Sequence, residues 1–172
     1  MTATWGRLAR GKTAMLRILI VTACIFAQIG PAAADWNYVK WGMTPSQAIG
    51  ASKGEASATK ADGKNIACAF TDQTVVARVP TKKIGNSNYE VTICASAGVV
   101  SSVVLRPQPA DGSFNILRTA LLGRYGKPIE EGRGDISTIT WRDEKGRNLV
   151  RLVRVIDTAS IEYRSLGSSS GL

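Results

Sequence analysis

Histidine is absent from this chain of 172 residues. Its absence excludes Ser-His-Asp and Cys-His catalytic arrangements, the commonest general base and most zinc sites. Cysteine is scarce, and none of the three cysteines belongs to a CxxC pair, which argues against a redox-catalytic role. No glycine-rich phosphate loop is present, because Gly132 and Gly134 lack the strand-to-helix context that this motif requires. We therefore expect no catalytic residue, no metal site and no cofactor.

Carboxylates are the acid and base groups that remain. Glu130, Glu131 and Asp135 share one charged, glycine-rich connector, and two of them could serve as the acid and base of sugar cleavage. Carboxylates in a polar loop are usually only solvated. The sequence therefore favours a protein that is not an enzyme, and an enzyme acting on envelope carbohydrate is the lesser alternative.

An apolar run long enough to span a membrane is also missing from the N-terminus. Residues 18–29 form an apolar segment of about a dozen residues, whereas a membrane span needs roughly 20. Basic residues without an acid precede this segment, and Ala32, Ala33 and Ala34 follow it. This order is typical of a secretory signal peptide. We predict a signal peptide over residues 1–34, cleavage after Ala34, and a periplasmic or secreted bacterial protein.

A lipoprotein is the alternative destination. Residues 21–24, Val-Thr-Ala-Cys, resemble a bacterial lipobox, in which Cys24 would carry the lipid and anchor the protein to a membrane. Only six residues separate Arg17 from Cys24, and the residues after Cys24 stay apolar. Both features favour cleavage over lipidation.

The mature chain carries an ordinary basic charge. Four of the 22 basic residues and none of the 13 acidic ones precede Asp35, which leaves 18 against 13 and a net charge of +5. In an exported protein this charge points to anionic envelope material or an acidic partner, although it also serves solubility alone. No interleaved basic and aromatic motif indicates nucleic acid.

Two cysteines remain after cleavage, Cys68 and Cys94. An even number in an oxidising compartment predicts a disulfide. Simple strand alternation opposes it, because Cys68 shares a face with Ile66 and Phe70 whereas Cys94 shares one with Thr92. A bulge, or a sheet covered on both sides, would reconcile the two positions. Two buried free thiols are the alternative.

The mature N-terminus predicts a strand that leads into a capped helix. Aromatic and β-branched residues alternate over residues 36–41, as in a half-buried strand. Thr44 suits an N-cap, Pro45 suits the first helical position, and Gln47 completes a capping box. Gly54 is placed to end the helix. The strand aromatics belong either to the core or to an exposed patch that binds a partner.

Further elements are predicted by hydrophobic periodicity. A second helix starts at Asp111 or Ser113, carries an apolar stripe over residues 114–125, and stops at Gly126 and Pro128. Residues 80–88, rich in lysine, glycine and asparagine, are predicted to form a loop. Strands are predicted at 66–70, 74–79, 89–95, 99–106, 136–142, 147–155 and 160–164.

The order of elements, helix then strands and again helix then strands, predicts an α+β protein. We expect a single domain over residues 35–166, with halves at 35–106 and 107–166 and a disordered tail at 167–172. In each half a helix would lie on one face of an antiparallel sheet.

The motifs WGMTPSQ, LLGRYGKP and the final IEY strand resemble a group of small exported bacterial proteins of unknown function. These share a WGM-(S/T) opening and a YGKP helix end. More distantly, Gly42-Met43-Thr44 before an antiparallel sheet is similar to outer-membrane assembly lipoproteins of the SmpA/OmlA type and to the β-lactamase-inhibitor-protein fold. Those proteins bind other proteins, so the resemblance implies a binding module and transfers no catalytic residue.

These observations together predict an exported, non-enzymatic module that binds an envelope protein or an anionic surface. A protein that binds a small ligand between its two halves is the alternative. The expected partner-binding residues are Trp36, Tyr38, Trp41, Arg147, Arg151 and Arg154.

Overall fold

A computed structural model describes residues 35–59, 68, 73–109 and 113–167. The predicted signal peptide, the lipobox-like segment, the cap residue Asp111 and nearly all of the predicted tail lie outside these residues. The predicted strand 66–70 also lies outside them, apart from Cys68. Within the described part, no helix is long and apolar enough to cross a membrane.

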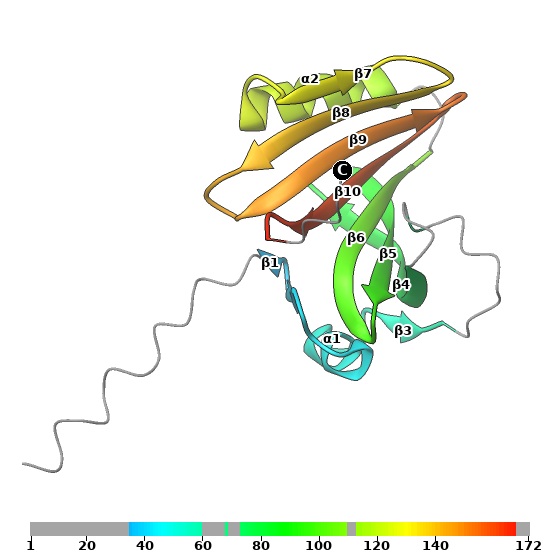
Figure 1. Ribbon diagram of the computed structural model, residues 1–172. Helices are drawn as coiled ribbons and strands as arrows, with labels where there is room; N and C mark the ends of the chain where they lie inside the picture. The colour runs from blue at the N-terminus through cyan, green and yellow to red at the C-terminus, as the bar shows by residue number, and fades with distance from the viewer. Residues whose placement is uncertain (1–34, 60–67, 69–72, 110–112, 168–172) are drawn as a thin grey trace, which may run out of the picture. The chain divides into compact units, whose positions relative to one another are not determined.

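The architecture is dominated by one antiparallel sheet, in the spatial order β3-β4-β5-β6-β10-β9-β8-β7. A separate hairpin pairs β1 (Asp35–Trp36) with β2 (Val39–Lys40). Figure 1 shows β6 and β10 side by side in the middle of the sheet. The eight strands are β3 (Ser57–Ala58), β4 (Thr74–Ile84), β5 (Ser87–Ser96), β6 (Val99–Gln108), β7 (Glu130–Gly132), β8 (Ile136–Asp143), β9 (Asn148–Val155) and β10 (Thr158–Ser165).

The predicted α+β fold of two helix-plus-sheet halves is wrong. The strands form one continuous sheet, because β10 pairs with β6 over four residues and joins the meander β8-β9-β10 to the meander β4-β5-β6. The two helices in the described residues are short, so the fold is rich in β-structure. A pairing between strands far apart in sequence leaves no local pattern, and hydrophobic periodicity therefore did not reveal it.

The loop predicted over residues 80–88 is also wrong for most of its length. β4 continues to Ile84 and β5 starts at Ser87, with Gly85 at the turn. A register shift between Val79 and Lys82 interrupts the ladder next to Pro80. Proline cannot donate to a ladder and is tolerated at such an irregularity. The polar composition of residues 80–88 indicated a loop, but these residues form the end of the β4–β5 hairpin.

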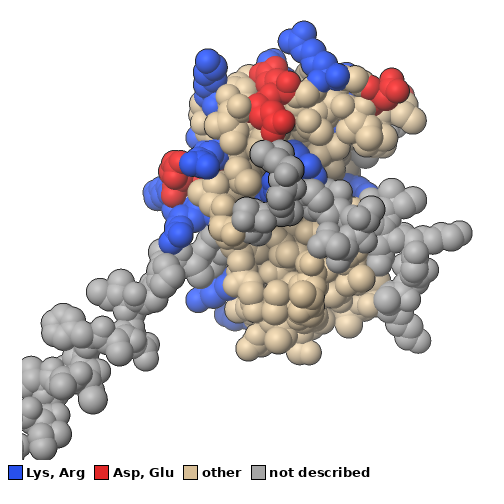
Figure 2. Space-filling model, viewed as in Figure 1, with Lys and Arg blue, Asp and Glu red and all other residues tan. Residues whose placement is uncertain are grey.

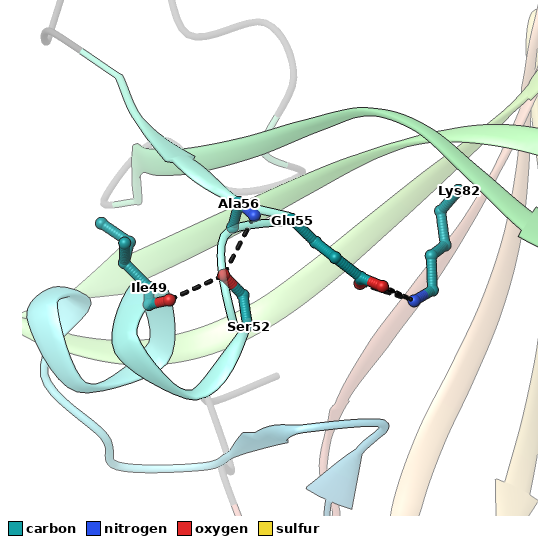
Figure 3. Close-up of polar contacts among 5 residues, drawn as sticks. All are labelled: Ile49, Ser52, Glu55, Ala56 and Lys82. Atoms are coloured by element: carbon teal, nitrogen blue, oxygen red, sulfur yellow. Dashed lines mark hydrogen bonds and ion pairs between the residues drawn. The ribbon is translucent and has the colours of Figure 1, made fainter.

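Helix α1 (Pro45–Ala51) begins as the sequence predicted, but it ends at Ala51 with Ser52 as its C-cap, before the predicted stop at Gly54. The backbone N–H of Gln47 donates to Thr44 Oγ1 at 3.3 Å, and the backbone N–H of Thr44 donates to Gln47 Oε1 at 2.9 Å, which confirms the capping box. At the other end, the buried Ser52 hydroxyl donates to Ile49 O at 2.6 Å and accepts from the Ala56 N–H at 3.0 Å. Figure 3 shows this turn.

The segment after α1 is attached to the sheet by an ion pair. Lys82 Nζ of β4 lies 2.7 Å from Glu55 Oε1, as Figure 3 shows. The same ammonium group lies 5.9 Å from the centre of the Tyr38 ring, in the β1–β2 hairpin. Burial raises the pKa of Tyr38, and the charge of Glu55 raises it further. The hairpin, the end of α1 and β4 therefore meet around one lysine.

Helix α2 (Phe114–Tyr125) matches the second predicted helix. Gly126 follows it with a φ of 74°, a conformation that favours glycine. The indole N–H of Trp141, a fully buried residue of β8, donates to Gly126 O at 3.0 Å. This bond satisfies a carbonyl at the helix end and fixes α2 against the sheet. The helix contacts β8, β9 and β10.

Both helices contribute to one hydrophobic core on one side of the sheet, which we call the helix face. Ala48 of α1 and Leu117 of α2 belong to the same buried cluster. Leu105 of β6 and Ile161 of β10 are paired across the middle of the sheet and belong to it too. Ile139, Trp141 and Tyr163 also contact this core. β8 and β10 therefore direct alternate residues toward this core.

The predicted disulfide is confirmed between Cys68 and Cys94. Cys94 pairs with Val75 of β4 and Ser102 of β6, and a bulge follows it in the β5–β6 ladder. Both cysteines are buried with Val75 and Val104 in a second, smaller cluster. Val104 adjoins the core residue Leu105 in β6 and points to the other side of the sheet. A sheet covered on both sides therefore resolves the conflict that alternation posed.

Candidate functional site

An open groove of about 830 Å³ lies on the helix face. It lies between α2, the β1–β2 hairpin and the turn that joins β8 to β9, above the central strands. We call it the central groove. Its lining residues are Trp36, Asn37, Ile84, Tyr89, Leu105, Leu117, Ala120, Leu121, Arg124, Tyr125, Asp143, Lys145, Gly146, Asn148, Ile161 and Tyr163.

The floor of the central groove is apolar and rigid. Leu105 and Ile161 are Cα partners in the paired strands β6 and β10. Leu117 and Leu121 of α2 form one wall, and all four side chains are buried in the main core. A floor built from paired strands and a packed helix keeps its shape, as a binding site requires.

Three tyrosines, Tyr89, Tyr125 and Tyr163, add polar groups to the groove. Burial raises the pKa of Tyr163, and Tyr125 raises it further, against a smaller lowering effect of Arg124. Tyr163 therefore stays protonated at neutral pH and offers a hydroxyl rather than a phenolate. The Tyr125 hydroxyl is buried, and a hydrogen bond between the Tyr125 and Tyr163 side chains contributes to the raised pKa of Tyr163.

The rim of the central groove carries two cations and one anion. The Arg124 guanidinium lies 5.2 Å from the centre of the Tyr125 ring, and Lys145 is exposed on the opposite side of the groove. The Asp143 carboxylate accepts the backbone N–H of Gly146 at 2.8 Å and is thus engaged within its own turn. The cations are the charges that remain for a ligand.

The aromatic patch expected at Trp36, Tyr38 and Trp41 is not a continuous exposed surface. Trp36 is buried in the core, while Tyr38 and Trp41 are half-buried. The Trp41 indole N–H donates to Asn148 Oδ1 at 2.9 Å and so links the first residues of the domain to β9. Trp36 and Asn148 line the central groove, but Tyr38 and Trp41 do not.

The three arginines expected to bind a partner do not lie together. Arg147 is exposed in the turn before β9. Arg151 and Arg154 point to opposite sides of β9: Arg154 is paired with Ala159 on the helix face, and Arg151 is paired with Glu162 on the other. The side chains therefore cannot act as one cationic site.

Arg151 forms a buried ion pair that the sequence did not reveal. Its Nη2 lies 2.7 Å from Glu162 Oε2, and Glu162, in the central strand β10, is only 1 % exposed. Burial raises the pKa of Glu162, while Arg151 and Arg164 partly lower it. The partner of Glu162 is set by strand register, which no local sequence signal specifies.

The connector carboxylates do not converge. Glu130 and Glu131 are consecutive residues of β7 and so point to opposite faces. Glu131 lies 3.6 Å from Arg118 of α2, and Asp135 is exposed in the next turn. The residues that the structure describes also hold no group of three or more Cys, Asp or Glu side chains placed to bind a metal ion.

Charge is unevenly spread over the surface. Figure 2 shows basic and acidic side chains intermingled on the upper part of the view, while the lower part around α1 is mostly uncharged. No charged residue occurs between Lys40 and Lys53. On this side of the molecule the basic side chains do not form one continuous patch. This side therefore offers no continuous basic surface that could bind an extended anionic surface.

The tyrosines of the central groove were the residues that sequence reasoning missed. Tyr125 was assigned to the apolar stripe of the second helix, and Tyr163 lies in the strand predicted at 160–164. Both residues line the groove as well. The signal was the recurrence of tyrosine at the ends of elements that meet in the folded chain.

Comparisons with models of protein families, with curated proteins and with solved structures find no match to this chain. The resemblance of the short motifs to small exported bacterial proteins therefore stays a prediction, and the central groove is the feature that bears on function.

Proposed function

We propose that the chain is an exported, non-enzymatic binding protein that holds a small amphipathic ligand in the central groove. The observation that carries this proposal is the groove, in which an apolar floor, tyrosine hydroxyls and rim cations meet. Its volume of about 830 Å³ falls within the range of roughly 300–1,000 Å³ that is usual for small-molecule sites.

The lining specifies the chemistry of the ligand. The apolar body of the ligand, a ring or a branched chain, would cover Leu105, Ile161 and the wall of α2. A hydroxyl or carbonyl group on it would pair with the tyrosines of the lining. An acidic group would lie near Arg124 and Lys145 at the rim, where an ion pair in partly desolvated surroundings strengthens binding.

A binding role suits the protonation states in the groove better than catalysis does. A general base must be deprotonated near the working pH, whereas the pKa of Tyr163 is raised. Asp143 is the carboxylate in the groove lining, and it is bonded to its own turn. These groups can donate or accept hydrogen bonds, which orients a ligand without reacting with it.

The test compares two matched tryptophan variants on α2. Ala120 lines the groove and is exposed, so Ala120→Trp fills the groove without entering the core. Ile116, 74 % exposed, lines neither the groove nor the core, so Ile116→Trp is the control on the same helix. We expect amphipathic acids found by a thermal-shift screen to bind the wild type and the control equally. Ala120→Trp should weaken binding at least about tenfold, since a filled groove excludes the ligand.

Two outcomes would contradict the proposal. In one, no amphipathic acid raises the melting temperature of the wild type. In the other, Ala120→Trp and Ile116→Trp bind equally well, which would place the ligand elsewhere. Calorimetric titration of each hit against the three proteins separates these cases.

A further inference from the structure

A second cavity, of about 360 Å³, opens on the helix face beside the first turns of α2. Phe114, Asn115 and Arg118 of α2 form one side. Ser137 and Ile139 of β8 lie beneath, and β7 with the following turn forms the other side. The full lining is Phe114, Asn115, Arg118, Glu131, Gly132, Arg133, Gly134, Ser137, Ile139 and Arg154.

Three cations border this cavity, Arg118, Arg133 and Arg154, and we call it the arginine pocket. Its lining contains a single carboxylate, Glu131, which lies 3.6 Å from Arg118 Nη2. That distance is longer than a close charge-assisted hydrogen bond. The lining thus carries three positive charges against one negative, and two arginines have no carboxylate partner among the described residues.

Arg154 is held in a fixed orientation without being neutralised. Its guanidinium lies 4.8 Å from the centre of the Phe114 ring, and its Nη2 donates to Ser137 Oγ at 3.0 Å. Stacking and this one bond leave most of the five guanidinium N–H donors unused. Arg133 is exposed in the β7–β8 turn and makes no ion pair within the described residues. The N-terminal end of α2 adds a smaller positive potential.

Arginines from α2, the β7–β8 turn and β9 line one hollow, and the planar guanidinium group matches the oxygen atoms of a phosphate group. We propose that the arginine pocket binds a phosphate group, either free or at the end of a larger envelope molecule. The volume leaves room for a small group attached to the phosphate. This site is separate from the central groove, so its failure would leave the proposed function untouched.

The experiment compares two variants: one removes a positive charge inside the arginine pocket, and the other removes a positive charge outside it. Arg133→Ala removes a pocket cation that is exposed and makes no ion pair within the described residues, so the variant should fold. Arg142→Ala is the matched control, because Arg142 is exposed, pairs with Glu144 and lies outside the pocket. The exported protein, labelled with ¹⁵N, is titrated with inorganic phosphate at constant ionic strength, and the arginine side-chain N–H signals are followed. Vesicles with and without phosphatidic acid form the second arm.

We expect phosphate to shift the N–H signals of Arg118, Arg133 and Arg154. Arg133→Ala should weaken phosphate binding about tenfold, the usual scale for one charge-assisted hydrogen bond, and Arg142→Ala should change it less than about twofold. Tighter binding to phosphatidic acid vesicles, with the same dependence on Arg133, would identify a lipid as the source. Equal losses in both variants, vesicle binding without phosphate binding, or no shift with phosphate would each overturn the proposal.

Discussion

Glu162 is the residue whose environment departs furthest from what its position in the sequence indicates. It lies in the middle of the sheet, opposite Arg151, and is almost completely buried. Removing a carboxylate from water disfavours its charged form, and the attraction of Arg151 and Arg164 only partly offsets this effect. The cost of taking both charges out of water offsets much of the attraction within such a pair, so the pair adds little net stability.

The raised pKa of Glu162 predicts how stability depends on pH. The native state keeps the Glu162 proton to a higher pH than the unfolded state does, so the free energy of unfolding should fall as pH rises through this interval. The loss should begin near the ordinary glutamate value of about 4.3 and end above the raised value. Urea unfolding of the wild type and of Glu162→Gln, between about pH 4 and pH 8, measures it.

Histidine is the side chain that ordinarily titrates between about pH 5 and pH 8. Because the chain has no histidine, no histidine titration adds to the pH dependence of stability in this range. Glu162→Gln cannot release the proton, so the stability difference between wild type and variant should shift against the wild type as pH increases. A difference that stays constant, or that shifts in favour of the wild type, would show that the pKa of Glu162 is not raised.

At the scale of elements, local chemistry was predictable and pairing was not. The capping box of α1 and the glycine end of α2 involve residues within a few positions of one another, and both formed as predicted. The polar arm of the β4–β5 hairpin was assigned to a loop because its composition resembles one. Its strand conformation comes from ladder bonds between Lys82 and Tyr89 and their neighbours, a tertiary effect that overrides propensity.

The disulfide is the element-scale feature that stabilises the side of the sheet opposite the helices. Replacing both Cys68 and Cys94 with alanine opens a closed loop with a sequence separation of 26 residues. Loop entropy predicts a loss of about 3 to 4 kcal/mol in the free energy of unfolding. Because the central groove lies on the helix face, ligand affinity should stay unchanged while stability falls.

Urea unfolding and calorimetric titration of the double variant check both parts of this prediction. A loss in stability below about 1 kcal/mol would mean that the bond does little to restrict the unfolded chain. A large loss of affinity would mean that the disulfide supports the groove, against the placement of the two on opposite sides of the sheet.

At the scale of the whole domain, the pairing of β6 with β10 creates both the fold and the site. It converts two meanders into one sheet and sets Leu105 beside Ile161 on the floor of the central groove. The sequence predicted each meander approximately but not their union, because contacts between residues so far apart follow from packing rather than from periodicity. The groove could not be predicted for the same reason, although most of its side chains were assigned to the correct elements.

If the chain binds a small ligand in the central groove, a small molecule should contact Ala120. If it binds a protein partner there, a protein should contact Ala120. An amino acid with a short aliphatic diazirine side chain, which is too small to fill the groove as tryptophan does, is placed at position 120 in the cell, with position 116 as the control on the same helix. Mass spectrometry of the purified protein then gives the mass of whatever is attached. We predict an adduct of small-molecule mass at position 120 and none at position 116. A protein-sized adduct at position 120, equal labelling at both positions, or no adduct would contradict the proposed function.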